Sequence, residues 1–123
     1  MNKTNSDETR KNVERVVDLI MEKKGEDILI LDLSDITTVS DFFIITTGNS
    51  NVHIKAIADE IREKMKQDYG ENPWHVEGYT AMKWVLLDFV DFVVHIFDAE
   101  TRTYYSLEKI WKDAQHRMVK TNY

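Results

Sequence analysis

The chain has 123 residues, with 16 Lys and Arg against 22 Asp and Glu, so its formal net charge is −6. That length fits one domain, 1–123, and a composition of 42% hydrophobic residues with 4 Gly and 1 Pro excludes a disordered or low-complexity chain. The acidic balance disfavours a grip on nucleic acid, whose phosphates are bound by Lys and Arg, and the lack of Cys excludes disulfides and zinc ribbons.

The first predicted element is an amphipathic helix of about four turns. Ser6 is its cap candidate, and Gly25 follows its carboxyl end. Residues 1–6 are expected to fray. One apolar stripe at helical spacing carries this prediction: Val13, Val16, Val17 and Ile20.

Two near-continuous apolar runs come next, at 27–33 and 42–47. Such runs are typical of strands that are covered on both faces. Asn49 and Ser50 then offer a helix cap, and Gly70 closes the second predicted helix. The apolar stripe of that helix is Ile54, Ile57, Ala58, Ile61 and Met65.

The second half of the chain predicts three strands, at 74–77, 84–88 and 92–97, the last two joined as a hairpin. A final helix follows Ser106, with Leu107, Ile110, Trp111 and Ala114 on one stripe, and 118–123 are expected to fray. The element order is α-β-β-α-β-β-β-α. It predicts an α/β single domain with a mixed five-stranded sheet flanked by helices.

The first twelve residues are polar and carry no secretory signal, and no apolar run approaches the roughly 18 residues of a membrane span. We therefore expect a cytoplasmic protein without a membrane partner.

Metal and acid chemistry find little support in the sequence. The four histidines, His53, His75, His95 and His116, form no HExxH or HxH motif. His95 stands inside an apolar run, which favours a hydrogen-bonded, half-buried imidazole over a catalytic base. Most carboxylates bracket strands, which is typical of solvated sheet edges. We expect no metal, no cofactor and no catalytic residue.

The turn at 47–50 joins a predicted strand to a helix N-terminus, where backbone amides can hold a phosphate. Neither GxGxxG nor GxxxxGK[ST] is present there. A tight turn capped by Asn49 or Ser50 explains the residues equally well.

The stretch 77–100 carries −4 of the −6, as five acids and Lys83, interleaved with aromatic residues. Aromatic side chains supply buried area at interfaces, and acids steer a basic partner. The alternative is a strand pair with an aromatic inner face and acidic rims. Phe89 and Val90 favour the interface, because a hairpin turn normally carries polar residues or Gly.

Five segments of the chain together carry a family resemblance across 27–114. They read DILILDL, DFFIITTGNSNVHIKAIADEI, VEGY, WVLLDFVDFVVHIFD and RTYYSLEKIW. In order and spacing they resemble the ribosomal silencing factor family, also called RsfS or Iojap-like.

The resemblance implies a nucleotidyltransferase-like α/β fold and a function that is not enzymatic. Family members bind the large ribosomal subunit through a basic ribosomal protein, large-subunit protein fourteen. Their bulk there blocks subunit joining and represses translation, and free members often form homodimers. The resemblance implies no sequence-specific contact with nucleic acid.

By resemblance, the partner-binding residues are the tryptophan before the fourth strand, the apolar residue of the hairpin turn and the tyrosine before the last helix. These are Trp84, Phe89 and Tyr105. We add Asp88 and Asp91 as acids that face the basic partner, and Met82 as an extension of the apolar patch. The sequence departs from the family at Val90, where many members carry Gly, so the turn type there stays open.

The implied fold also raises an alternative, a nucleotide-binding enzyme with a degenerate site. Gly48 and Ser50 resemble the Gly-Ser loop of nucleotidyltransferases. No Asp-x-Asp occurs in the chain to hold magnesium, so we favour the non-catalytic function.

Overall fold

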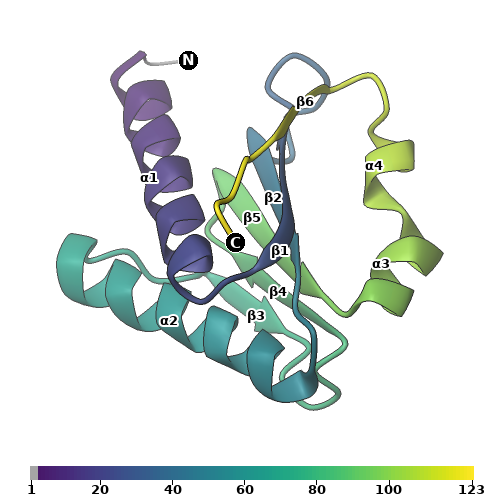
Figure 1. Ribbon diagram of the computed structural model, residues 1–123. Coiled ribbons are helices and arrows are strands. Elements are labelled where there is room, and N and C mark those ends of the chain that lie inside the picture. The colour runs from purple at the N-terminus through teal and green to yellow at the C-terminus, as the bar shows by residue number, and fades with distance from the viewer. Residues whose placement is uncertain (1–2) are drawn as a thin grey trace.

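The computed structural model describes residues 3–123, with side chains from residue 7 onward. One mixed sheet has helices on both faces (Figure 1). The helices are α1 (Lys3–Glu22), α2 (Asn51–Tyr69), α3 (Ala99–Tyr105) and α4 (Leu107–Ile110). The strands are β1 (Glu26–Asp32), β2 (Phe42–Thr47), β3 (His75–Glu77), β4 (Trp84–Asp88), β5 (Phe92–Phe97) and β6 (Gln115–Met118).

The sheet has the order β3-β4-β5-β2-β1-β6. Only β2 and β5 pair in parallel, and the other four pairings are antiparallel. The α/β class and the mixed sheet are confirmed. The predicted count of five strands is wrong, because β6 pairs with β1 as a sixth. Its four residues are all exposed, so no apolar alternation marks it in the sequence.

The helix predicted to follow Ser106 is shorter than expected: α4 ends at Ile110, and a separate helix that was not predicted, α3, precedes it. Ser106 adopts a left-handed conformation (φ 47°) between α3 and α4, and its hydroxyl donates to the Thr103 carbonyl instead of capping α4. Asp98 caps α3, accepting the Thr101 amide at 2.7 Å. The observed order is therefore α-β-β-α-β-β-β-α-α-β.

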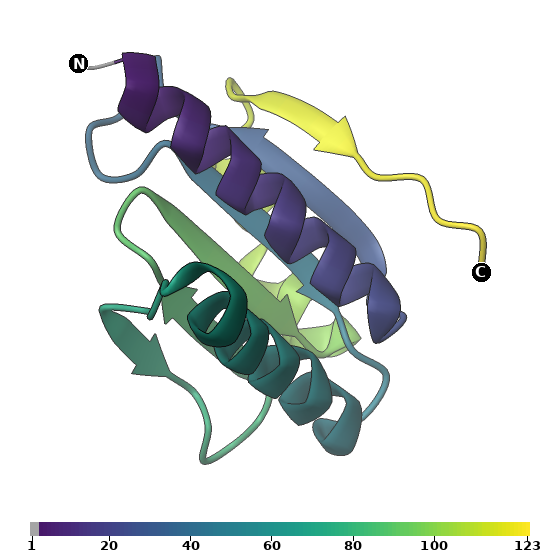
Figure 2. The ribbon, with the colours of Figure 1, turned by 90° about the vertical axis from the view of Figure 1, so that its left-hand side faces the viewer.

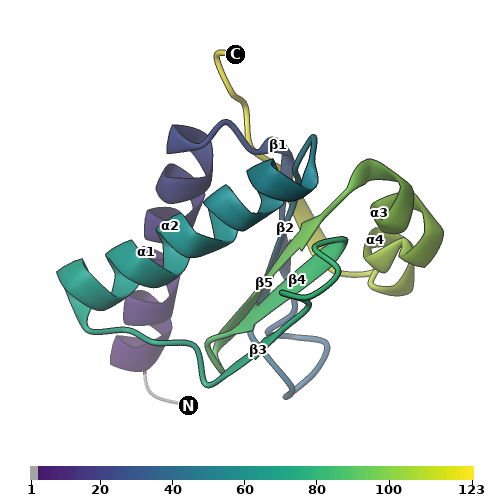
Figure 3. The same ribbon diagram turned by 90° about the horizontal axis from the view of Figure 1, so that it is seen from below.

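Helices α1 and α2 cover one face of the sheet (Figures 2 and 3). Their apolar stripes pack on the inner side chains of β1, β2, β4 and β5, forming the larger core. Ser50 caps α2, accepting the His53 amide, and Gly70 ends it with φ 67°, both as predicted.

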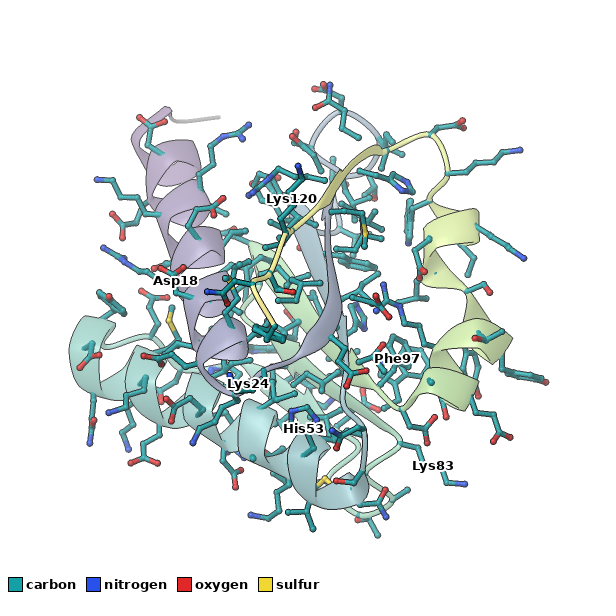
Figure 4. The ribbon with its side chains drawn as sticks, viewed as in Figure 1. Asp18, Lys24, His53, Lys83, Phe97 and Lys120 are labelled. Carbon is teal, nitrogen blue, oxygen red and sulfur yellow. The ribbon has the colours of Figure 1, made fainter. Side chains whose placement is uncertain are left out.

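The short helices α3 and α4 lie over the opposite face (Figure 3). The smaller core beneath them joins Leu29, Leu31, Ile45, Phe97 and Leu107, with Phe43 and Trp111 at its edge. Figure 4 shows Phe97 between the sheet and α3.

The structure differs from the prediction at both ends of the described chain. Helix α1 begins at Lys3, upstream of the expected cap, and Lys24 rather than Gly25 takes the left-handed conformation after it. At the other end, the Val119 amide donates to the Ile28 carbonyl, and the Tyr123 hydroxyl donates to the Gly25 carbonyl. The expected fraying of 118–123 stays a prediction. The expected fraying of 1–6 also stays a prediction, and residues 1–2 lie outside the described residues.

Candidate docking surface on the open sheet face

Strand β4 is two-sided. Val85 and Leu87 are buried against α1 and α2, so Trp84, Leu86 and Asp88 lie on the opposite face, where all three are half-buried. On the edge strand β3, Val76 packs on the larger core, which places His75 and Glu77 beside them. We call this set of five residues the β3–β4 face: Trp84, Leu86, Asp88, His75 and Glu77. It is a part of the α3–α4 side that is open to solvent.

Trp84 anchors an aromatic cluster at one end of the β3–β4 face. Its ring stacks on Phe97 at 4.8 Å between centroids and meets Tyr105 at 4.8 Å. Tyr105 is the last residue of α3 and is 47% exposed. The structure thus brings together two of the predicted partner-binding residues from separate segments.

His95 supports this cluster from below. The Trp84 indole N–H donates to His95 Nδ1 at 3.1 Å, and the imidazole lies 4.5 Å from the Phe43 ring. The hydrogen bond agrees with the sequence-based expectation, but the side chain is only 3% exposed rather than half-buried. Burial lowers the pKa of His95 to about 3, so the ring is neutral at physiological pH.

A tight loop presents Trp84 to this surface. The Met82 amide donates to the Gly78 carbonyl at 3.0 Å, and Met82 has a positive φ of 55°. Lys83 points away from the molecule just before β4 begins (Figure 4). The loop therefore fixes where β4 starts and which way its first side chain faces.

The acids Asp88 and Asp91 lie at the far end of β4. Asp88 lies four residue steps along β4 from Trp84, a distance of about 13 Å. Asp88 is half-buried and accepts the Val90 amide at 2.8 Å, whereas Asp91 is exposed. Burial raises the pKa of nearby Asp41, and the charges of Asp91 and Asp32 add to the effect. This end of the sheet is thus negatively charged.

Phe89 and Met82 are not part of the β3–β4 face. Phe89 is 7% exposed and stacks on Phe92 at 4.8 Å, inside the core under α1 and α2. Met82 lies in the same core. The structure separates these two predicted residues from Trp84 and Tyr105 by the thickness of the sheet.

The residue exposed at the hairpin tip is Val90. The Asp91 amide donates to the Phe89 carbonyl across it, so Val90 is the centre of a three-residue γ-turn with φ 77°. A β-branched residue rarely adopts this conformation, which resolves the turn type that the sequence left open. The unusual turn lets Phe89 point inward although it stands at a hairpin turn.

In the turn at 47–50, two backbone amides that could bind a phosphate are already hydrogen-bonded within the protein. The Gly48 amide donates to the Phe97 carbonyl, and the Asn49 amide donates to His53 Nδ1 at 2.9 Å. A Cβ on Gly48 would lie 2.7 Å from Ile54 Cγ1, so close packing accounts for this glycine. Within 3–123, no group of three or more His, Asp and Glu is placed to hold a metal ion.

Sequence reasoning missed Leu86 and the contact of His95 with Trp84. The period of two along β4 was the available signal for Leu86, since it places residues 84, 86 and 88 on one face. No sequence signal pairs His95 with Trp84, because their contact depends on the register of β4 against β5.

Among the helices of the described residues, none has the length and hydrophobicity that a membrane span requires.

Comparison with known proteins gives one consistent result. Residues 6–122 match the family model described as "Ribosomal silencing factor during starvation". A Bacillus subtilis protein named "Ribosomal silencing factor RsfS" is 44% identical over 93 residues, 76% of this chain and 78% of that one. A Chromobacterium violaceum crystal structure superposes with a TM-score of 0.80 at 33% identity, covering 84% of this chain and 85% of that one.

A more distant mouse relative is named "Mitochondrial assembly of ribosomal large subunit protein 1". It is 28% identical, over 81% of this chain and 45% of the mouse protein.

Proposed function

The chain belongs to the ribosomal silencing factor family, whose members are non-enzymatic regulators of ribosomes and translation, and from that premise we propose how it acts. It docks on the large ribosomal subunit through a basic ribosomal protein, large-subunit protein fourteen. Its bulk then blocks joining of the small subunit and represses translation. The name of the mouse relative supports the large subunit as the particle concerned.

The observation that carries this proposal is the contact of Trp84 with Tyr105 at one end of the β3–β4 face. Two aromatic side chains from distant segments touch each other beside the half-exposed Leu86. Half-exposed aromatic residues of this kind are typical anchors of protein interfaces. Such a contact between proteins requires no bound metal, cofactor or substrate.

The charges around the anchor favour a basic partner. Glu77 and Asp88 lie on the β3–β4 face, and Asp91 lies at its end. A ribosomal particle is rich in RNA and repels a chain of charge −6. A basic protein on the particle surface is therefore the component that this face fits.

Steric exclusion requires only a stable contact and sufficient volume. We propose that Trp84, Tyr105 and Leu86 provide the buried contact, while Asp88 and Asp91 accelerate and orient the encounter. Phe89 and Met82 act indirectly, as core residues that hold β4 and the hairpin in place.

Co-sedimentation with purified large subunits tests the proposal. Loss of an aromatic anchor reduces affinity by about 2 kcal/mol or more, about thirtyfold. We expect Trp84→Ala to abolish co-sedimentation and to restore subunit joining in sucrose gradients. Leu86→Lys provides a second test at a half-exposed position, and Val52→Lys, on the exposed surface of α2, is its matched control.

The proposal fails if folded Trp84→Ala and Leu86→Lys proteins both sediment with the large subunit as the unchanged protein does. Circular dichroism and urea unfolding establish that the variants are folded. Homodimerisation of the free protein, which follows from the family resemblance, stays a prediction that light scattering can test. A cytoplasmic location, which the sequence predicts from its lack of a secretory signal and of a membrane span, also stays a prediction.

A further inference from the structure

His95 is a polar residue in an apolar position. It occupies the centre of β5, a strand whose six residues are all buried, and pairs with Ile45 on β2 and Leu86 on β4. Its ring lies among Phe43, Trp84 and Phe97. An aromatic hydrocarbon side chain would fill this space without burying any nitrogen.

The hydrogen bond from Trp84 fixes the state of this imidazole. An indole nitrogen can only donate, so His95 Nδ1 must be the acceptor, and the ring proton must be on Nε2. Nε2 is buried without a hydrogen-bond partner among the described residues. A buried, unpaired N–H destabilises a fold, so packing alone gives no reason for a histidine here.

The contacts of Trp84 indicate what His95 contributes. Stacking on Phe97 and the contact with Tyr105 restrict where the indole plane lies. Stacking is weakly directional, and it tolerates rotation of the indole within its plane or a reversal of its two edges. A hydrogen bond requires near-linear geometry and so selects one orientation.

Resting on the docking function proposed above, we propose that His95 is a positioning residue, which accepts the Trp84 indole N–H and so holds Trp84 in the orientation that the ribosomal partner binds. His95 itself is buried and does not touch the partner. Because the ring is neutral at physiological pH, its Nδ1 is free to accept this hydrogen bond there.

Two substitutions separate the acceptor from the ring. His95→Phe keeps an aromatic ring and removes the acceptor, whereas His95→Asn keeps an acceptor, Oδ1, at the place of Nδ1. We expect His95→Phe to weaken binding to the large subunit about three- to tenfold. Its thermal stability should change little, because the loss of the unpaired Nε2–H offsets the loss of the acceptor for the Trp84 indole N–H. His95→Asn should keep most of the binding.

A double-mutant cycle links the effect to Trp84. Trp84→Phe removes the indole N–H, so adding His95→Phe to it should change binding no further. A purely structural role for His95 predicts instead that His95→Phe lowers stability and binding together, and that the two substitutions add. That result would overturn the proposal.

NMR of the free protein gives a readout that needs no partner. The Nε2–H tautomer of His95 and a Trp84 indole N–H protected from exchange are expected, the latter lost in His95→Phe. An Nδ1–H tautomer, or an unchanged Trp84 signal in His95→Phe, would refute the positioning role. Should the docking function itself be wrong, Trp84→Ala leaves ribosome binding intact while these NMR signals still behave as stated.

Discussion

Gly78 lies directly against the backbone of Trp84. A Cβ placed on Gly78 would stand 1.9 Å from the Trp84 carbonyl oxygen and 3.0 Å from the Val85 Cα. Gly78 also has φ 94°, which other residues rarely adopt. Two independent restrictions therefore require glycine at the residue that follows β3, where the chain turns toward the docking anchor.

Gly78→Ala should destabilise the protein by about 2–4 kcal/mol, because strain and a backbone clash act together. Urea unfolding measures this loss. Gly70→Ala is the matched control, since Gly70 also has a positive φ but no atom lies within 4 Å of its added Cβ. Gly70→Ala should cost about 1 kcal/mol. Equal losses at both positions would mean that the contact with Trp84 is unimportant.

Asp91→Lys should slow association with the large subunit, most strongly at low salt, because Asp91 is exposed at the end of the docking surface. Stopped-flow or surface-plasmon measurements between about 50 and 300 mM salt follow the effect. Asp68→Lys changes the net charge by the same amount from an exposed position on α2. If both reversals slow association equally, net charge and not a local surface governs the encounter.

Phe89→Ala should cost about 3–5 kcal/mol of stability, because it removes a buried ring that stacks on Phe92. Binding by the fraction that stays folded should change little, since Phe89 lies on the other side of the sheet. Binding titrations corrected for the folded fraction decide the matter. A large loss of intrinsic affinity would show that Phe89 leaves the core and touches the partner.

Val90→Gly should stabilise the hairpin by about 1 kcal/mol, because glycine adopts the φ of 77° without strain. The midpoint of urea unfolding is the measurement. Val52→Gly, at an exposed position in α2, should have the opposite sign. A loss of stability in Val90→Gly would indicate that the valine side chain contributes more than the strained turn costs.

Acid should destabilise the fold through His95. Its pKa is about 3 in the folded state and near 6.5 in the unfolded chain, so between these values the unfolded state binds more protons. The free energy of unfolding therefore rises with pH across this window, by up to about 1.4 kcal/mol per unit. The free energy of unfolding is measured at pH 7, 5.5 and 4.5 for the unchanged protein and for His95→Phe. The carboxylates contribute equally to both proteins, so the difference between the two curves gives the contribution of His95. Parallel curves would contradict it.

Most of the fold was predictable because its elements have strong local signals. The stripe that ends at Met65, the run 42–47 and the cap at Ser50 each specify a helix or strand from neighbouring residues alone. β6 was not predictable, since it is a short, exposed edge strand of mainly polar residues, held by its pairing with β1 and by an ion pair between Arg117 and Glu14. Helix α3 was likewise not predicted, and the left-handed conformation of Ser106 separates it from α4.

The site was predictable only in part, for a related reason. Trp84 and Tyr105 could be named by resemblance, but which face each side chain occupies depends on strand register. The inward position of Phe89 follows from the strained turn at Val90, and the contact of His95 with Trp84 follows from the pairing of β4 with β5. Both are tertiary effects.

The pairing of β6 with β1 has a consequence for how the protein is made. Asp32 pairs with Gln115 and Leu29 with Met118, so the sheet joins the first strand to be synthesised with the last. Contacts between such distant parts of a chain form slowly, since a long loop must close before they do. Until β6 pairs, that edge of β1 has unpaired backbone N–H and C=O groups.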